Sequence, residues 1–333
     1  MFKQFRHPII LGTGKHRVFD DRFLGIGRSN GVVFLRGHVE SVSIHRHGLD
    51  AAGKAGDPVP MALEPCHDPN DPRLEDFRDI RDRDLRGRQG IFIGEQPLVV
   101  EKMLDQPGLV RRILVSETRR DWLERTLADR GHPDVPCIVA SRDIIENIVG
   151  FDLHRGVLAS GNRAALDNRS LQDVIPPPDQ PATILCCDSI NNMDNIGMLF
   201  RTAAAFGVDA VLLDPTCHDP LYRKSLRVSI GHALTIPYIR STDWTADLAE
   251  LRADHRVELL GASLGAGSTA AADIEPPARV AIVMGSEFEG LRPETIDACT
   301  RLVRIPMAPK IDSLNVAVAA AVLLDRFSRT ARA

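Results

Sequence analysis

Residues 184–207 read ILCCDSINNMDNIGMLFRTAAAFG. The stretch begins with the apolar run Ile184–Cys187, which has the length of a buried strand. A polar loop follows, and apolar side chains then recur at helical spacing from Ile196 to Phe206. Because a strand joined to a helix by a short loop is the repeating unit of α/β folds, this stretch predicts an α/β domain with a largely parallel sheet.

The same alternation continues through the C-terminal half of the chain. Further strands are predicted at residues 210–213, 235–239, 257–261, 280–284 and 302–305, and further helices at 244–253 and 314–328. No internal repeat is detected in this half. The pattern therefore predicts one α/β domain over residues 183–330.

A smaller α/β module is predicted ahead of this domain, at residues 88–163. Strands are expected at 91–93, 112–116, 137–140 and 156–159, and helices at 96–104, 121–130 and 142–149. Ser141 is well placed to cap the last of these helices. Residues 164–182 contain three consecutive prolines, which predict a stiff linker between the two domains.

The first 60 residues differ from the rest in composition. They hold nine of the 41 Lys and Arg residues and five of the 45 Asp and Glu residues, which leaves 32 basic and 40 acidic residues in the remainder. They show little helical or strand periodicity. We expect residues 1–60 to be a poorly ordered extension, a segment upstream of the true start codon, or a small ordered extension. Residues 61–87 look like an extended lead-in segment.

The composition is that of a globular protein. The chain has 333 residues, of which 44% are hydrophobic and 26% charged, which excludes collagen-like, coiled-coil and wholly disordered classes. The longest apolar run, Val316–Leu324, is far shorter than the roughly 20 residues of a membrane span. The N-terminus lacks the apolar stretch of a secretory signal, so we expect a cytoplasmic protein. A net charge of −4 argues against nucleic-acid binding by bulk electrostatics but allows a local basic groove.

Metal and disulfide sites are not expected. The six cysteines form no C-x-x-C motif, and four of them lie in or beside apolar runs, where free thiols behave as small hydrophobic groups. Two short groups could ligate a metal, His45 with His47 and Cys66 with His67, but neither has further ligands at the spacing of a metal site. We expect these residues to be exposed and polar.

Familiar nucleotide-binding motifs are incomplete. Residues 48–55 resemble a phosphate-binding loop, but Ala55 replaces the hydroxyl residue that would hold magnesium. The glycine pairs at 12–14 and 25–27, and the glycines at 261–267, lack the spacing of a dinucleotide fingerprint. A dehydrogenase or another small-molecule enzyme of this class is therefore disfavoured.

Three loops of the second domain combine glycine with polar residues directly after a predicted strand, the place where parallel sheets bind ligands. The first leads to Asn195 and Arg201, and Arg201 lies on a helix whose other positions are mostly apolar. On its own, Arg201 is better explained as a helix-face arginine in a surface salt bridge than as a functional cation. Polar residues of the loop alone do not decide between these alternatives.

The second and third loops raise the same question. The second, MGSEFEGL at residues 284–291, contains Glu287 between two glycines that could form a plain turn or allow a close approach to a ligand. The third follows Ile305 and contains Ser313, a candidate N-cap of the last helix. Asn315 is expected inside the first turn of that helix, where it is a poor helix former. A polar side chain there suggests a functional role.

Together the three loops resemble the motifs of the SpoU (TrmH-type) ribose 2′-O-methyltransferases of the SPOUT superfamily. The resemblance extends from Ile184 to Arg329 and includes the segment Arg227–Pro237. The first module resembles the small α/β RNA substrate-binding module, similar to certain ribosomal proteins, that is often fused ahead of this domain. Two departures concern the subfamily: Asn192-Met193 replaces the usual Asp-Pro, and Ala317 replaces a frequent Ser.

The resemblance implies an α/β fold in which a parallel-sheet SPOUT methyltransferase domain contains a deep trefoil knot. The general rarity of knots would instead have predicted a simple doubly wound sheet. The implied activity is S-adenosyl-L-methionine-dependent 2′-O-methylation of a ribose in structured RNA, with no metal. The front module favours ribosomal RNA over tRNA. A tRNA methyltransferase and a non-catalytic RNA-binding protein with the same fold are the alternatives. A homodimer with its sites at the interface is also implied.

The resemblance also assigns roles to residues. Arg201 would activate the ribose hydroxyl, either as a cation that stabilises the developing alkoxide or anchors a phosphate, or as a base; a guanidinium is normally protonated, which favours the cation. Asn195 would orient that arginine or the ribose, and Glu287 would steady the loop or the substrate. Ser313 and Asn315 would form hydrogen bonds near the reacting centre. Backbone groups of three residues would hold the cofactor's adenosine: Gly285, Ile305 and Leu314. RNA capture by the front module would use five arginines: Arg111, Arg112, Arg119, Arg120 and Arg155.

Overall fold

The computed structural model describes residues 25–29, 32–36, 63–80, 90–132, 134–150, 155–311 and 313–328. The chain divides into two compact units, Met1–Asp57 and Pro58–Ala333. In the first unit, β1 (Gly25–Ser29) and β2 (Val32–Arg36) pair antiparallel. Most of the expectation for residues 1–60 therefore falls outside the described residues.

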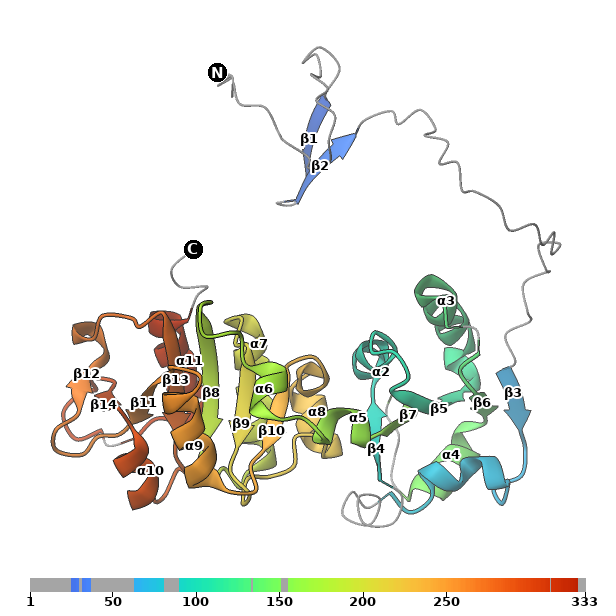
Figure 1. Cartoon of the computed structure of the whole chain (residues 1–333). Coiled ribbons are helices and arrows are strands. Elements are labelled where there is room, and N and C mark those ends of the chain that lie inside the picture. Colours follow the sequence, from blue (N-terminus) through green and yellow to red (C-terminus); the bar gives the residue numbers. More distant parts are fainter. Residues whose placement is uncertain are drawn as a thin grey trace, which may run out of the picture. The chain divides into compact units, whose positions relative to one another are not determined.

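The second unit begins with a five-stranded sheet in the order β3-β6-β5-β7-β4 (Figure 1). Its strands are β3 (Leu63–Cys66), β4 (Ile91–Glu95), β5 (Val110–Ser116), β6 (Cys137–Ala140) and β7 (Val157–Asn162). Its helices are α2 (Pro97–Leu104), α3 (Arg120–Arg130) and α4 (Arg142–Val149). Ser141 caps α4 as predicted, accepting a hydrogen bond of 3.4 Å from the backbone N–H of Ile144.

The pairing in this sheet is mixed. Strand β7 lies between β4 and β5 and runs antiparallel to both, whereas β3, β6 and β5 pair in parallel. The alternation of strands and helices predicted a largely parallel sheet, which is found only in part of this module. Periodicity identifies single strands, but it does not determine which strands pair.

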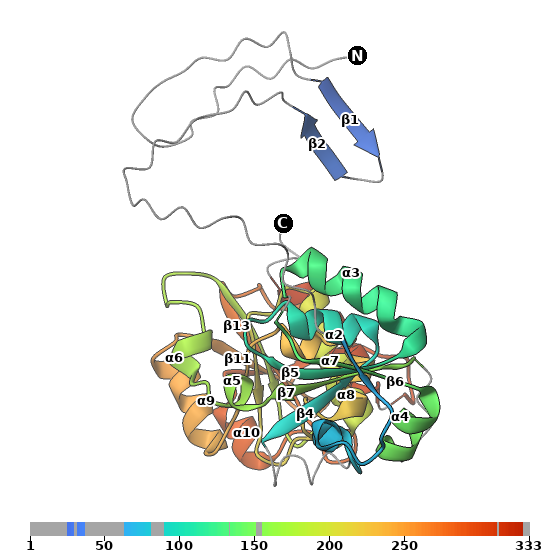
Figure 2. The ribbon, with the colours of Figure 1, turned by 90° about the vertical axis from the view of Figure 1, so that its right-hand side faces the viewer.

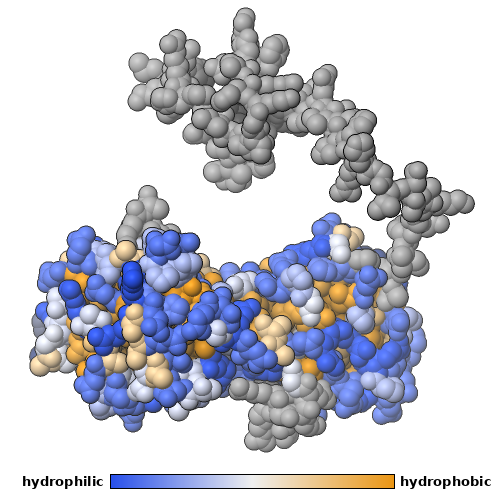
Figure 3. All heavy atoms as spheres, in the orientation of Figure 1, coloured by the Kyte–Doolittle hydropathy of each residue, from blue (hydrophilic) through white to orange (hydrophobic). Residues whose placement is uncertain are grey.

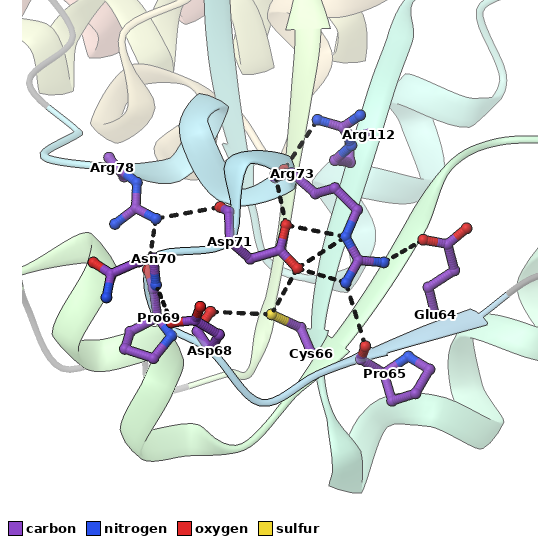
Figure 4. Close-up of polar contacts among 10 residues, drawn as sticks. All are labelled: Glu64, Pro65, Cys66, Asp68, Pro69, Asn70, Asp71, Arg73, Arg78 and Arg112. Atoms are coloured by element: carbon purple, nitrogen blue, oxygen red, sulfur yellow. Dashed lines mark hydrogen bonds and ion pairs between the residues drawn. The ribbon is translucent and has the colours of Figure 1, made fainter.

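Residues 63–80 pack on this sheet through a polar network (Figure 4). Asp71 caps the 3₁₀ helix η2 (Pro72–Phe77) by accepting from the backbone N–H of Arg73 at 2.8 Å. The side chain of Arg73 donates further hydrogen bonds to this carboxylate and holds the pKa of Asp71 well below its usual value. Arg112 of β5 donates to the carbonyl oxygen of Arg73 at 2.9 Å. The segment that the sequence presents as a lead-in thus supplies the edge strand β3 and a capped turn.

Cysteines are mostly interior residues. Cys66 was expected to be exposed beside His67, but it is buried and donates to the carboxylate of Asp71 at 3.6 Å, so that expectation was wrong for the cysteine. Burial raises the pKa of Cys137 and of Cys217 to about 12. His45 and His47 lie outside the described residues.

The larger sheet has seven strands in the order β10-β9-β8-β13-β11-β14-β12, and all of its pairings are parallel. The strands are β8 (Ala182–Cys187), β9 (Ala210–Leu213), β10 (Tyr238–Arg240), β11 (Glu258–Ala262), β12 (Thr269–Ala270), β13 (Arg279–Met284) and β14 (Arg301–Arg304). The helices are α7 (Met193–Ala205), α8 (Arg223–Val228), α9 (Trp244–Ala253), α10 (Pro293–Ala298) and α11 (Val316–Phe327). The predicted parallel α/β domain is confirmed.

Helices cover both faces of this sheet (Figure 2). Leu185 and Cys187 of β8 pack with α7 and α11, whereas Ile184 and Cys186, on the opposite face, pack with α9. Because both faces of the strand are buried, it reads as a continuous apolar run rather than an alternating one. Polar residues cover most of the surface in view, with apolar side chains visible between them (Figure 3).

The segment 164–182 contains two short helices, α5 (Ala164–Asp167) and α6 (Leu171–Val174). Its prolines are held by Arg279, which donates hydrogen bonds to the carbonyl oxygens of Pro177 at 2.8 Å and Pro176 at 2.9 Å. Just before it, Arg163 forms an ion pair of 2.9 Å with Asp219. These contacts fix the segment at several points.

Two predictions about element ends differ from the structure, and two short helices were not predicted. The strand expected at 235–239 begins only at Tyr238, because the 3₁₀ helix η4 (His232–Leu234) precedes it. The helices α8 and α10 were not predicted, since six residues contain too few periodic positions. The N-cap of α11 is Asn315, not Ser313: its Oδ1 accepts from the backbone N–H of Ala317 at 3.0 Å. Asn315 thus lies before the helix, where asparagine is favoured.

No helix in the part of the chain that the structure describes has both the length and the apolarity to cross a membrane.

Candidate active site

The loops that follow β11, β13 and β14 form a cavity of about 390 Å³ at the carboxyl ends of these strands. Parallel sheets bind ligands at this edge. Five of the residues predicted for the site line this cavity: Gly285, Glu287, Ile305, Ser313 and Leu314. The structure therefore brings together the second and third loops singled out in the sequence.

The first loop joins them through a set of three hydrogen-bonded side chains. Nδ2 of Asn315 donates to Oδ1 of Asn195 at 2.9 Å and to Oε1 of Glu287 at 2.8 Å. Nδ2 of Asn195 donates to the same Glu287 oxygen at 3.0 Å. Oδ1 of Asn315 is used to cap α11, so one side chain fixes the helix start and also positions the other two.

The loop after β13 is unusually tight. Backbone hydrogen bonds of 3.1 and 3.0 Å join Ser286 and Gly290 in both directions. A Cβ atom on Gly285 would lie 2.2 Å from the carbonyl carbon of Gly290, a distance that no side chain tolerates. Glycine at position 285 therefore allows the two ends of the loop to approach each other closely. The loop presents Glu287, Phe288 and Glu289 from a fixed base.

A buried pair of carboxylates anchors the far end of this loop. Arg292 donates from Nε to Oδ1 of Asp188 at 2.6 Å and from its backbone N–H to Oδ2 at 3.0 Å. Its guanidinium also bonds Asp214. Asp188 and Asp214 are fully buried at the ends of β8 and β9. Arg292 had no signal in the sequence analysis, because its partners lie 104 and 78 residues away.

Arg201 lies apart from the residues that the sequence analysis grouped with it. It is exposed on α7 and lines neither this cavity nor the one described next. Six residues correspond to roughly 600° of helical rotation, so Asn195 and Arg201 point in directions about 120° apart. The side chain of Asn195 bonds Glu287 and Asn315; the resemblance implied that it orients Arg201 or the ribose.

The surroundings of Arg201 are cationic. Among the described residues no carboxylate pairs with it, so the surface salt bridge that was the alternative does not form there. Burial lowers the pKa of His232, and the charges of Lys102 and Arg201 lower it further. The three side chains come from α2, α7 and η4. An uncompensated positive charge of this kind favours an anion such as phosphate.

A second cavity, of about 520 Å³, adjoins the first. It is lined by residues 189–195, Lys224 and residues 286–289, and the last four of these also line the first cavity. Asn192, at a position where Asp is usual in the family resembled, caps α7 by accepting from the backbone N–H of Asp194 at 2.7 Å. Lys224 pairs with Asp194 at 2.7 Å.

Phe288 stands on the wall between the two cavities, with 98% of its surface exposed. No role for this residue was expected from the sequence. An aromatic residue in an otherwise polar, glycine-flanked loop is a signal that could have drawn attention to it.

Of the five arginines expected to capture RNA, three have partners in the protein. Arg111 pairs with Asp76 at 3.3 Å, Arg120 pairs with Glu124 at 3.0 Å, and Arg112 donates to a backbone carbonyl. Arg119 and Arg155 form no ion pair within the described ranges. A Cβ on Gly156 would lie 3.5 Å from Cγ of Arg119, which brings Arg119 close to the chain at Arg155.

The family model and the similar proteins all describe RNA methyltransferases. The family model described as the SpoU rRNA Methylase family matches residues 182–325. The chain is 35% identical over 283 residues to an uncharacterized tRNA/rRNA methyltransferase of Mycobacterium tuberculosis, covering 82% of this chain and 94% of the relative. It is 32% identical to the 23S rRNA (guanosine-2′-O-)-methyltransferase RlmB of Acinetobacter baylyi, covering 68% of this chain and 92% of that one.

Solved structures show the same fold. An AdoMet-bound rRNA methyltransferase from Sinorhizobium meliloti superposes with a TM-score of 0.66 at 23% identity, covering 79% of this chain and 97% of the other. An RNA 2′-O ribose methyltransferase superposes with a TM-score of 0.64 at 25% identity, covering 81% and 98%. The similarity includes the front module as well as the larger sheet, since these shares exceed the length of residues 182–325.

Proposed function

Since the chain belongs to the SpoU rRNA methylase family, we propose that this S-adenosyl-L-methionine-dependent RNA 2′-O-methyltransferase acts on ribosomal RNA. The observation that carries the substrate choice is the likeness to RlmB, a methyltransferase named for 23S rRNA. The similarity to RlmB covers 68% of the present chain. A tRNA substrate is the alternative, because the relative that covers more of the chain is named for both RNA classes. We expect the enzyme to act in the cytoplasm, where it would meet both classes of RNA.

The first cavity fits the cofactor. Its volume of about 390 Å³ lies in the range of small-molecule sites. Leu264 and Leu314 supply apolar surface for a heterocycle, and Gly285, which has no side chain, lets a ligand approach the backbone closely. Peptide groups of Gly285, Ile305 and Leu314 would hold the adenosine. The bound cofactor supplies a methyl group on a positively charged sulfur.

The remaining chemistry falls to the side chains of the protein. A ribose hydroxyl is a weak nucleophile at neutral pH, so the site must stabilise the negative charge that develops on its oxygen. As the oxygen–carbon bond forms and the carbon–sulfur bond breaks, the hydroxyl proton passes to water. We assign this to Arg201, which acts as a cation because a guanidinium keeps its proton. Glu287, held by Asn195 and Asn315, positions the ribose, and Ser313 on the cavity wall forms a hydrogen bond near the reacting oxygen.

A homodimer accounts for the distance between Arg201 and the cofactor cavity. Helices α7 and α11 pack together and expose Met198, Val318 and Val322, each more than 40% exposed. A second copy of the chain covering these side chains removes apolar surface from water. Arg201 lies on the same helix as Met198, and in such a dimer it reaches the cavity of the other copy.

The trefoil knot expected from the family is part of the proposal. It is supported by the nearness of the loops after β13 and β14, which line the same cavity before α11 begins.

The test of the proposed function uses purified enzyme, tritiated S-adenosyl-L-methionine, and unmodified ribosomal RNA and tRNA transcripts in parallel. We expect label in ribosomal RNA with wild type and at most a trace with Arg201→Ala. Calorimetry should show the same cofactor affinity for both proteins, because the role assigned to Arg201 is to stabilise the ribose oxygen and not to hold the cofactor. Label in tRNA alone would contradict the substrate choice.

The site shared between two copies is tested by mixing two inactive variants, Arg201→Ala and Asn315→Ala. A heterodimer of the two contains one intact site if Arg201 serves the partner's cavity, so co-expression should restore about a quarter of the wild-type activity. No recovery, with heterodimers demonstrated by differential tags, would place Arg201 in the site of its own chain.

A further inference from the structure

We propose that the second cavity binds the nucleobase of the nucleotide to be methylated, and that the ring of Phe288 stacks on this base. The proposal rests on the proposed function and adds to it the place of the RNA base and a residue that recognises it. The cavity, its lining and the exposed ring are three separate observations that agree.

The ring of Phe288 is presented to solvent by a rigid support. Phenylalanine is normally interior, yet 98% of this side chain is exposed. The loop that carries it is closed by the paired hydrogen bonds of Ser286 and Gly290, and Ser286 Oγ also accepts from the backbone N–H of Glu289 at 3.2 Å. A ring on a braced loop loses little conformational entropy when it binds.

The position of the ring matches the geometry of the reaction. Phe288 lines both cavities and directly follows Glu287, whose carboxylate is held where the cavities meet. If the cofactor lies in the first cavity and the ribose at Glu287, the base attached to that ribose enters the second cavity. A volume of about 520 Å³ lies in the range of small-molecule sites and leaves room for a base.

The lining of the second cavity is also suited to a base. Asn191 brings a side-chain amide, which can donate to and accept from the edge of a base, and Asn192 adds the Nδ2 donor that its cap of α7 does not use. Lys224 supplies a cation for the adjoining phosphate. Its pair with Asp194 is 41% and 44% exposed, and an exposed pair of this kind is weak enough to exchange partners.

A protein partner is less well matched to this ring. Its neighbours in the loop are Ser286, Glu287 and Glu289, so polar residues flank the ring along the chain. Protein interfaces place their aromatic residues in an apolar centre that excludes water. Unstacked RNA bases, in contrast, are recognised by single exposed aromatic rings.

The experiment compares Phe288→Ala, Phe288→Leu and Phe288→Trp in methyl transfer to ribosomal RNA. Loss of one stacked base should raise the KM for RNA by about 5- to 100-fold in Phe288→Ala. Phe288→Leu should be impaired almost as strongly, because it is apolar but cannot stack. Phe288→Trp should restore the wild-type KM. The affinity for S-adenosyl-L-methionine, measured by calorimetry, should stay within twofold in all three.

A matched control is Leu264→Ala, which removes another exposed apolar side chain that lines only the first cavity. It should weaken cofactor binding and leave the KM for RNA unchanged. Three results would overturn the proposal: an unchanged RNA KM in Phe288→Ala, a loss of cofactor affinity instead, or a loss of the dimer in Phe288→Ala that Phe288→Leu repairs. The proposed function fails separately, if wild-type enzyme that binds cofactor labels neither ribosomal RNA nor tRNA.

Discussion

Asn315 donates a hydrogen bond of 2.9 Å from Nδ2 to Oδ1 of Asn195, which lies 120 residues earlier in the chain. The other end of the same amide caps α11. A single side chain therefore links the start of the last helix to the loop after β8. The two functions can be separated by substitution, because aspartate caps a helix as well as asparagine but has no N–H to donate.

Asn315→Asp is expected to keep the stability of α11 and to lose activity. The variant retains the cap but places a carboxylate against Glu287, so methyl transfer should fall at least about tenfold, the effect of losing roughly 1.4 kcal/mol. Asn315→Ala should lose the cap as well, at a cost of about 1 kcal/mol in the free energy of unfolding. Urea titration and single-turnover methylation measure the two effects. Equal activity in Asn315→Asp and wild type would show that the amide donors are dispensable.

Gly285→Ala is expected to damage cofactor binding. Its Cβ would lie 2.2 to 2.4 Å from backbone atoms of Gly290 and Leu291, so the loop must move, and the cavity wall moves with it. The matched control is Gly290→Ala, which meets no atom within 4 Å and suffers only from its positive φ of 70°, a cost of about 1 kcal/mol. Calorimetry with S-adenosyl-L-methionine should show a much larger loss for Gly285→Ala. Similar losses in both variants would argue against the packing explanation.

Arg292→Gln is expected to destabilise the protein by about 3 to 5 kcal/mol, because it leaves the buried carboxylates of Asp188 and Asp214 without their cation. Arg301→Gln is the control: its pair with Glu258 is long, at 3.9 Å, and exposed, and such pairs contribute at most about 1 kcal/mol. Denaturant unfolding of both variants checks this. If Arg292→Gln unfolds at the wild-type midpoint, the anchor does not hold the loop.

Asp219→Asn tests the pH dependence of stability. Burial alone would raise the pKa of Asp219, but its ion pair with Arg163 outweighs this and holds the pKa below its usual value. A lowered folded-state pKa stabilises the protein above the unfolded-state pKa of about 4, and this contribution disappears as the pH falls through the folded-state pKa. The variant should therefore be less stable than wild type at pH 7, with the difference shrinking below about pH 4. A difference that is constant with pH would exclude a role for the ionised carboxylate.

Arg119→Gln combined with Arg155→Gln is expected to weaken RNA binding. Neither arginine has an ion-pair partner among the described residues, so both are available to phosphate. Each lost phosphate contact should make the slope of log K against log salt shallower by about 0.7 to 0.9. Arg120→Gln, whose pair with Glu124 already neutralises it, is the control and should change the slope less. Filter binding over a salt series measures these slopes.

Much of the secondary structure could be predicted because it is local. The strands at β8, β9, β11 and β13 and the helices α9 and α11 appear as predicted, within two residues, since each is defined by the periodicity of its own side chains. The three polar loops could also be located, because parallel strands of one sheet end at the same edge. For the same reason Gly285, Glu287, Ile305, Ser313 and Leu314 line one cavity.

The local pattern of the chain is thus enough to locate its elements, the loops that carry the chemistry, and the family to which they belong. Contacts made on folding establish that β7 runs antiparallel between β4 and β5, that Asn315 rather than Ser313 caps α11, and that Arg201 points away from Asn195. It also decided that Arg292 reaches two buried aspartates and that Phe288 stands exposed between two cavities. Each of these depends on residues distant in the chain, and local periodicity has no information about which distant residues meet.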